Sequence, residues 1–310
     1  MVKYGFLFPG QGAQFPGMMK DLCEKFADGK GFFEKYSKTA GFSISQLLWE
    51  SSEQELARTD KSQTAITAAS LLVVEFLKTK QINPSFAAGF SLGEWVALRA
   101  SEVLSFEETV YAVKRRGEIM QEVCDSIASA SANPPGMAAV IGLDGKTVQT
   151  VLKGREDVFA ANMNSTQQTV ISGTCAGLAW AEENLKNAGA RRIIPLKVAG
   201  PFHSPLMAEA AEKFSKVLDT LTFNDPVLPV FSNVTGKQVK TGDEARKNAV
   251  KHIVSPVLWI DEETSIHNMC NDFNDCKLIE AGPGKVLAGL WGKTEFARKI
   301  PCVSWDEMTA

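Results

Sequence analysis

The stretch Gly89-Phe90-Ser91-Leu92-Gly93 constrains the fold more than any other part of this 310-residue chain. It has the form Gly-x-Ser-x-Gly, in which a serine occupies a sharp turn between a strand and a helix, and the flanking glycines let the turn close. A short apolar run at 85–88 precedes it, and residues 92–100 are rich in helix formers. The pattern predicts a nucleophile elbow in an α/β fold. The alternative is an ordinary strand-to-helix turn that happens to contain a serine.

A second pattern predicts a smaller domain inside the first. After a Ser/Ala/Asn/Pro-rich segment at 130–135, the sequence alternates between strand-like and helix-like runs. The predicted strands are 137–141, 158–163, 168–172 and 191–198, and the predicted helices are 146–152 and 176–188. This βαββαβ order is that of a ferredoxin-like unit. We therefore expect a large α/β domain at 1–130 and 199–310 with a ferredoxin-like domain at 131–198.

Composition excludes several classes of function. The net charge is −3 and no long basic run is present, so neither nucleic acid nor a membrane surface is an expected partner. The first residues are too few and too broken by Pro9-Gly10 for a signal peptide, and no apolar run reaches the length of a membrane span. The six cysteines lack metal-ligand spacing. We expect a cytoplasmic protein with reduced thiols and without a metal or cofactor.

Arg116 carries the most informative charge. Residues 105–128 predict a long helix, and at helical period Arg116 falls on its apolar stripe between Val113 and Met120. An unpaired buried guanidinium is very costly, so this side chain needs a carboxylate partner or must reach solvent. The partner is either an internal Asp or Glu or a carboxylate on a substrate, gripped in bidentate fashion.

His203 is the best-placed base for an elbow serine. It lies in Gly200-Pro201-Phe202-His203-Ser204, just before a predicted helix start, and loops of this kind collect the catalytic residues of α/β folds. The chain has only three histidines. The other two, His252 and His267, fall late in one predicted helix and in the middle of another, which are poorer positions.

Two glycine-rich segments admit more than one interpretation. Residues 9–14 follow a short apolar run but lack the fingerprints of dinucleotide and phosphate loops. They indicate either close approach of backbone to a small ligand group or a surface turn. Residues 282–285, Gly-Pro-Gly-Lys, weakly resemble a phosphate loop, and we favour a turn that packs beneath the site.

Four segments, taken in chain order, resemble the malonyl-CoA:acyl carrier protein transacylases of fatty acid synthesis. They are Phe8-Pro9-Gly10-Gln11-Gly12-Ala13-Gln14, Gly89-Phe90-Ser91-Leu92-Gly93-Glu94, Arg116-Gly117 with Met120, and Gly200-Pro201-Phe202-His203-Ser204. Weaker matches occur at 161–165 and 280–287. The matches span nearly the whole chain. The resemblance implies an α/β-hydrolase-like large domain, with a mostly parallel sheet, and an inserted ferredoxin-like domain.

The resemblance also implies residue roles. Ser91 would be the nucleophile that forms a malonyl ester, and His203 its base. The backbone N–H groups of Gln11 and Leu92 would form the oxyanion hole, and Arg116 would hold the malonyl carboxylate. The other positions assigned to the substrate side of the site are Gln63, Met120, Phe202 and His252, and in the family the position of His252 helps to orient the catalytic histidine. No acid is clearly placed as a third triad member, so we expect a backbone carbonyl to orient the base.

Three positions depart from the family pattern. Phe90 stands where His is usual, His252 where Gln or Asn is usual, and Thr64 where Pro is common. The change at His252 is silent if the family contact uses the backbone carbonyl there. If the contact uses the side chain, a second titratable group lies near the base.

These observations predict a monomeric acyltransferase that passes malonyl from malonyl-CoA to the pantetheine thiol of acyl carrier protein in a ping-pong reaction. A trans-acting acyltransferase of polyketide synthesis is the alternative with the same chemistry. An esterase or thioesterase is less favoured, because it needs an acid after a large-domain strand between the serine and the histidine. A binding module would not need Ser91, His203 and Arg116 together.

Overall fold

A six-stranded sheet forms the centre of the larger part of the molecule. The computed structural model describes residues 2–309. The strands lie in the order β10-β9-β1-β2-β7-β8, and only the last pair is antiparallel. Their bounds are β1 Lys3–Phe8, β2 Pro84–Gly89, β7 Val230–Ser232, β8 Lys237–Val239, β9 Cys276–Glu280 and β10 Cys302–Ser304. Parallel strands of this kind are covered on both faces, which explains their continuous apolar runs.

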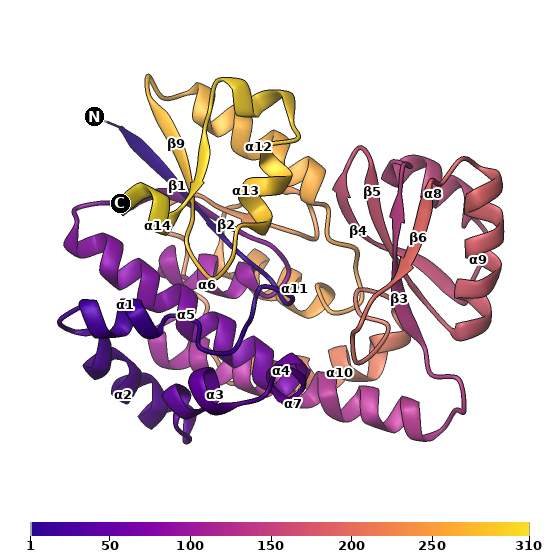
Figure 1. Cartoon of the computed structure of the whole chain (residues 1–310), viewed down its shortest axis with the longest axis horizontal. Coiled ribbons are helices and arrows are strands. Elements are labelled where there is room, and N and C mark those ends of the chain that lie inside the picture. The colour runs from indigo at the N-terminus through magenta and orange to yellow at the C-terminus, as the bar shows by residue number, and fades with distance from the viewer. Residues whose placement is uncertain (1, 310) are drawn as a thin grey trace.

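Helices cover both faces of this sheet (Figure 1). On one side lie α1 Lys20–Lys25, α2 Gly29–Ala40, α3 Ile44–Glu50, α4 Glu53–Ala57, α5 Thr59–Thr79, α6 Gly93–Ala100, α7 Phe106–Ser129 and α10 Ala208–Leu218. The remaining helices are α11 Gly242–Lys251, α12 Trp259–Asn271, α13 Val286–Trp291 and α14 Trp305–Thr309, with short 3-10 turns at Pro205–Met207 and Glu295–Arg298. A second apolar cluster around Trp259 and Trp291 fills the opposite face.

The two longest helices, α5 and α7, pack against each other and fix the position of Arg116. Gly117 permits the contact, because a Cβ there would lie 3.0 Å from the Thr59 carbonyl oxygen. Helix α7 begins with a reciprocal capping box between Ser105 and Glu108, which satisfies two backbone donors. The predicted helix over 105–128 is therefore present, and α5 begins four residues before its predicted start at Gln63.

A second sheet of four antiparallel strands lies beside the first (Figure 1). Its strands are β3 Gly136–Ile141, β4 Val158–Ser165, β5 Gln168–Gly173 and β6 Arg192–Pro195, in the order β4-β5-β3-β6. Helices α8 Gly145–Val151 and α9 Cys175–Asn187 cover its outer face. The predicted mixture of a mostly parallel sheet with further elements at 136–195 is confirmed. The last strand is shorter than the predicted 191–198, because residues 196–198 leave the sheet.

The two sheets meet where the functional loops gather. Val257, just before α12, exchanges two backbone hydrogen bonds with β4: its N–H donates to the Ala161 carbonyl and its carbonyl accepts from the Met163 N–H, both at 2.9 Å. The carboxyl ends of β1 and β2 lie side by side, with Phe8 opposite Gly89. Loops that follow parallel strands at one edge are the usual place for a ligand in α/β folds. None of the helices in the described part of the chain has the length and apolarity that a bilayer crossing demands.

Candidate active site

Ser91 lies on a sharp turn between β2 and α6, as the elbow pattern predicts. Its φ is +49°, a left-handed conformation that is costly for a residue with a side chain. Both flanking glycines are sterically required. A Cβ at Gly89 would lie 2.0 Å from the Gly93 carbonyl carbon, and a Cβ at Gly93 would lie 2.0 Å from the Phe8 carbonyl oxygen. The turn therefore closes only with the two glycines, and it projects the hydroxyl away from the sheet.

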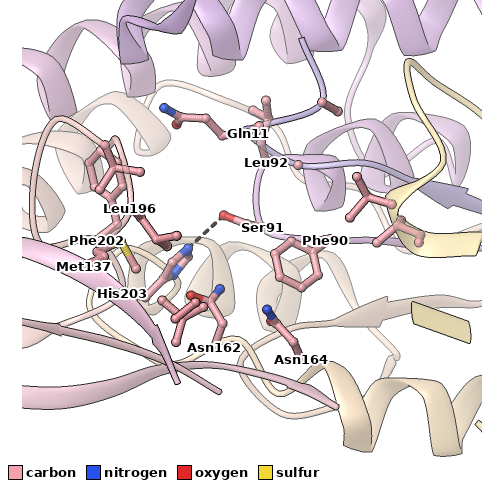
Figure 2. Close-up of a pocket in the computed structure, with 18 of the residues that line it drawn as sticks. Gln11, Phe90, Ser91, Leu92, Met137, Asn162, Asn164, Leu196, Phe202 and His203 are labelled. Atoms are coloured by element: carbon pink, nitrogen blue, oxygen red, sulfur yellow. Dashed lines mark hydrogen bonds between the residues drawn. The ribbon is translucent and has the colours of Figure 1, made fainter. Parts of the chain in front are cut away.

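His203 faces Ser91 across the site (Figure 2). Its Nε2 lies 2.8 Å from Ser91 Oγ. Its Nδ1 lies 3.0 Å from the carbonyl oxygen of His252 and 3.2 Å from that of Ser255. Carbonyl oxygens only accept hydrogen bonds, so Nδ1 carries the proton and Nε2 presents its lone pair to the serine hydroxyl. Two backbone carbonyls thus hold the tautomer that a general base requires.

The environment keeps His203 neutral. Burial and, as a smaller cause, the positive charge of Arg116 together lower the pKa of His203 to about 4, although the two carbonyls act in the opposite direction. The imidazole is therefore unprotonated near neutral pH and free to accept a proton. Burial and the neighbouring charges of His203 and Arg116 also hold the pKa of His252 well below its ordinary value. The second imidazole, whose ring centroid is 5.2 Å away, is likewise neutral.

Arg116 is buried in the wall of the site with only 1% of its surface exposed. Its Nη1 donates to Gln63 Oε1 at 2.8 Å, while Nε and Nη2 have no hydrogen-bond partner within residues 2–309. Burial lowers its pKa to about 10, so the guanidinium stays charged at neutral pH. Glu94 is close enough to raise the pKa of Arg116 somewhat, but among the described residues no carboxylate forms an ion pair or a hydrogen bond with the guanidinium.

These groups share one cavity of about 530 Å³. Gln11 and Leu92 also line it, and neither backbone N–H donates a hydrogen bond to another residue in the range 2–309. In Figure 2 both residues lie on one side of the Ser91 hydroxyl, and Asn162 and Asn164 of β4 lie on the other. Free backbone donors next to a serine are the groups that stabilise an oxyanion in acyl transfer.

The other predicted substrate-side residues differ in position. Gln63, Met120 and Phe202 line the cavity, and Gln63 Nε2 donates to Met120 Sδ at 3.5 Å. His252 does not line it. The ring of His252 is buried behind His203, and its contribution is the carbonyl described above. The backbone carbonyl at the end of α11 therefore contacts the base, which fits the orienting role that the resemblance implies for this position, whereas the ring does not reach the substrate side of the site.

Phe90 and the turn at 282–285 also have defined places. Phe90 lines the cavity and packs edge-on against Trp259 at 5.4 Å between ring centroids. Gly282 packs against Pro9 and Ser70, where a Cβ would lie 2.6 Å from atoms of each, and Leu287 beyond the turn lines the cavity. The segment thus packs beneath the site. Within the described residues, no group of three His, Cys, Asp or Glu side chains could hold a metal ion.

A buried polar cluster beneath the elbow was not anticipated. It contains Asn233, which directly follows β7, together with Glu94 of α6 and Glu262 of α12. Burial raises the pKa of Glu94 to about 7 and holds that of Glu262 well above its ordinary value. Glu94 Oε2 also lies 3.7 Å from His252 Nδ1. The sequence offers one indication of this cluster: Asn233 directly follows a predicted parallel strand, at the sheet edge where Ser91 lies.

A strained serine, a neutral histidine held by carbonyls, free backbone donors and an unpaired guanidinium define a serine-dependent acyltransferase site. Comparison with known proteins agrees. Residues 5–276 match the family model described as "Acyl transferase domain". The chain is 40% identical over 311 residues to the malonyl CoA-acyl carrier protein transacylase of Bacillus subtilis (strain 168), covering 99% of this chain and 95% of that protein. The chain belongs to the malonyl CoA-acyl carrier protein transacylases, within the acyl transferase family.

Solved structures support the same assignment. The malonyl CoA-acyl carrier protein transacylase of Clostridium perfringens superposes with a TM-score of 0.90 at 31% identity, covering 99% of this chain and 96% of that one. A malonyl-transacylase solved in complex with its type II PKS acyl-carrier protein gives a TM-score of 0.87 at 31% identity, with coverage of 98% and 96%. The family resemblance expected from the sequence motifs is confirmed.

Proposed function

We propose that this chain transfers malonyl from malonyl-CoA to the pantetheine thiol of acyl carrier protein and thereby supplies fatty acid elongation. The observation that carries the proposal is the unpaired guanidinium of Arg116 in the wall of the Ser91–His203 cavity. A buried cation without an internal partner is costly, and a substrate carboxylate removes that cost. Malonyl thioesters carry a free carboxylate, whereas acetyl thioesters do not.

The proposed reaction has two symmetrical halves. His203 Nε2 accepts the Ser91 hydroxyl proton while Oγ attacks the thioester carbonyl, and the N–H groups of Gln11 and Leu92 stabilise the oxyanion. The intermediate collapses, the C–S bond breaks, and the CoA sulfur takes the proton from His203. The carrier-protein thiol then attacks the malonyl-Ser91 ester, with His203 moving a proton from the thiol to Ser91 Oγ.

We also propose how the chain is divided into domains. We assign residues 131–198 to a ferredoxin-like domain inserted into an α/β-hydrolase-like domain at 1–130 and 199–310. The βαββαβ succession and the sheet order β4-β5-β3-β6 support the first, and the strand–elbow–helix unit around Ser91 supports the second. A monomeric state, a cytoplasmic location and the absence of nucleic-acid or membrane partners stay predictions.

Intact-protein mass after brief incubation with malonyl-CoA tests the proposed function. We expect the native chain to gain one malonyl group, Ser91→Ala to gain none, and the adduct to disappear when carrier protein with a free pantetheine thiol is added. An adduct that water alone discharges rapidly would indicate a thioesterase instead. Absence of any adduct, with no turnover, would overturn the proposal.

A role in polyketide synthesis is the second candidate. It is favoured by one observation, the structural similarity to the malonyl-transacylase bound to a type II PKS acyl-carrier protein. Discharge rates with purified carrier proteins from the two kinds of pathway would separate the candidates. The esterase alternative has less support, because Asp144 caps α8 through the Thr147 N–H and Asp157 pairs with Arg155, so neither approaches the base.

A further inference from the structure

Asn233 uses its side-chain amide to bridge the two arms of the nucleophile elbow. The Ser91 N–H donates to Asn233 Oδ1 at 2.6 Å, and Asn233 Nδ2 donates to the Gly89 carbonyl at 2.7 Å. One amide therefore accepts from the nucleophile and donates to the residue two positions before it. A neighbouring strand would pair with an extended segment by the same two kinds of hydrogen bond, one accepted and one donated. Here the side chain of Asn233 makes both of them, just beyond the end of β7.

Every polar atom of Asn233 makes a hydrogen bond. It is completely buried, its N–H donates to Glu94 Oε2 at 2.9 Å, and its carbonyl accepts from the Leu258 N–H at 2.9 Å. Its Nδ2 donates a second hydrogen bond, to Glu262 Oε2 at 2.6 Å. The Ser91 N–H can only donate and the Gly89 carbonyl can only accept, so these two backbone groups fix which end of the amide faces Ser91. The amide cannot flip without leaving buried groups unpaired.

We propose that Asn233 is a positioning residue for malonyl transfer, and that its amide, bonded to the Ser91 N–H and the Gly89 carbonyl, holds Ser91 and the adjacent Leu92 N–H in their reactive geometry. The proposal rests on Ser91 being the nucleophile of the proposed function. Asn233 does not line the cavity, so it acts only through the elbow.

The backbone of Ser91 shows why such support is needed. A left-handed φ at a non-glycine residue is strained, and it persists only where surrounding contacts enforce it. Relaxation of this turn would move Ser91 Oγ away from His203 Nε2 and turn the Leu92 N–H away from the oxyanion position. A displacement of about 1 Å at the reacting atoms can cost about 10²-fold in rate.

The first test measures malonyl-enzyme formation by rapid quench and mass spectrometry across malonyl-CoA concentrations. Asn233→Ala should lower the acylation rate constant by about 10²-fold, because the reacting atoms lose their alignment. The malonyl-CoA concentration at half-maximal rate should change by less than about threefold, because Arg116 and the cavity wall are unaltered. A merely structural loss would change both quantities, or only the amount of active protein.

The second test removes the two donor contacts of the Asn233 amide separately. Asn233→Asp replaces the Nδ2 donor with a carboxyl oxygen that faces the Gly89 carbonyl, and it should be as slow as Asn233→Ala. Glu262→Gln is the matched control. It should acylate within about threefold of the native rate, since it is isosteric with the protonated acid that burial favours and still accepts from Asn233 Nδ2.

The outcomes separate the two levels of the argument. If Asn233→Ala does not fold, Asn233→Asp decides. Asn233 variants that acylate at the native rate would overturn the positioning role. Failure of the native chain to acylate Ser91 at all would instead overturn the proposed function.

Discussion

The two sheets contribute unequally to one cavity. Every group with a chemical task in the proposed reaction belongs to the larger part: Ser91 follows β2, Gln11 follows β1, His203 precedes α10, and Arg116 lies on α7. The four-stranded sheet contributes wall residues, among them Met137, Asn162 and Leu196. One sheet thus supplies chemistry and the other supplies shape.

This difference follows from how the two sheets are built. Parallel strands end at a common edge of the sheet, and the loops that follow them bring residues distant in sequence close together in space. The antiparallel sheet presents a face instead of an edge, and side chains on a face stand at fixed spacing with period two. The face of a sheet can form a wall along which the pantetheine arm of a substrate lies. The edge of a sheet can instead bring several polar groups together at one point. Substitutions in the two regions should therefore differ in kind as well as in size.

The largest effect is expected for Arg116→Ala. This substitution removes the guanidinium that would bind the malonyl carboxylate. Because hydrogen bonds between charged groups are strong, kcat/KM for malonyl-CoA should fall by about 10²–10³-fold. Acetyl transfer should change by less than about threefold, because acetyl makes no such contact. Steady-state kinetics with both substrates measures this. Arg115→Ala is the control, because the neighbouring Arg115 is half-exposed, pairs with Glu118 and does not line the cavity. Equal losses on both substrates would contradict the role of Arg116.

The next effect concerns pH. Because burial and Arg116 lower the pKa of His203 to about 4, its neutral form persists through the range in which an ordinary histidine becomes charged. We expect kcat/KM, which reports the free enzyme, to stay level down to about pH 5 and then to fall about tenfold per unit. A midpoint near the ordinary histidine value would contradict this. In Arg116→Ala the midpoint should move to higher pH, since one cause of the lowered pKa is gone.

The smallest effect is expected from the four-stranded sheet. Leu196, 37% exposed, lines the cavity just beyond β6, and Leu196→Ala should raise KM for malonyl-CoA by at most about threefold with kcat unchanged, because it removes only apolar contact. Ile194→Ala is a matched control, since Ile194 is 43% exposed on β6 but does not line the cavity. A large fall in kcat for Leu196→Ala would mean that the wall takes part in the chemistry.

Local patterns in the sequence predicted the parts of the site that short-range chemistry dictates. The elbow could be predicted because its two glycines leave no room for a side chain. The importance of Arg116 could be predicted because a charged residue falls on the apolar stripe of a helix. Long-range partners escaped this approach. Helix α5 begins at Thr59 because the Thr59 N–H donates to Gln121 of α7 at 2.9 Å, a cap that lies 62 residues away in the chain.

The buried cluster beneath the elbow escaped for the same reason. Asn233, Glu94 and Glu262 lie far apart in sequence, and each one alone reads as an ordinary polar residue. Their burial follows only from the packing of β7, α6 and α12 around one turn. The extent of β6 depended on tertiary context too, because the strand ends at Pro195 and residues 196–198 line the cavity instead.

The left-handed backbone of both reacting residues has a consequence for the evolution of this chain. Ser91 has φ +49° and His203 has φ +57°, so each adopts a conformation that asparagine or glycine tolerates better. A chain selected for thermal stability alone would not keep serine and histidine at these two positions. Activity and stability are thus opposed at the two residues that exchange a proton, and stabilising substitutions there would be found readily and would abolish turnover.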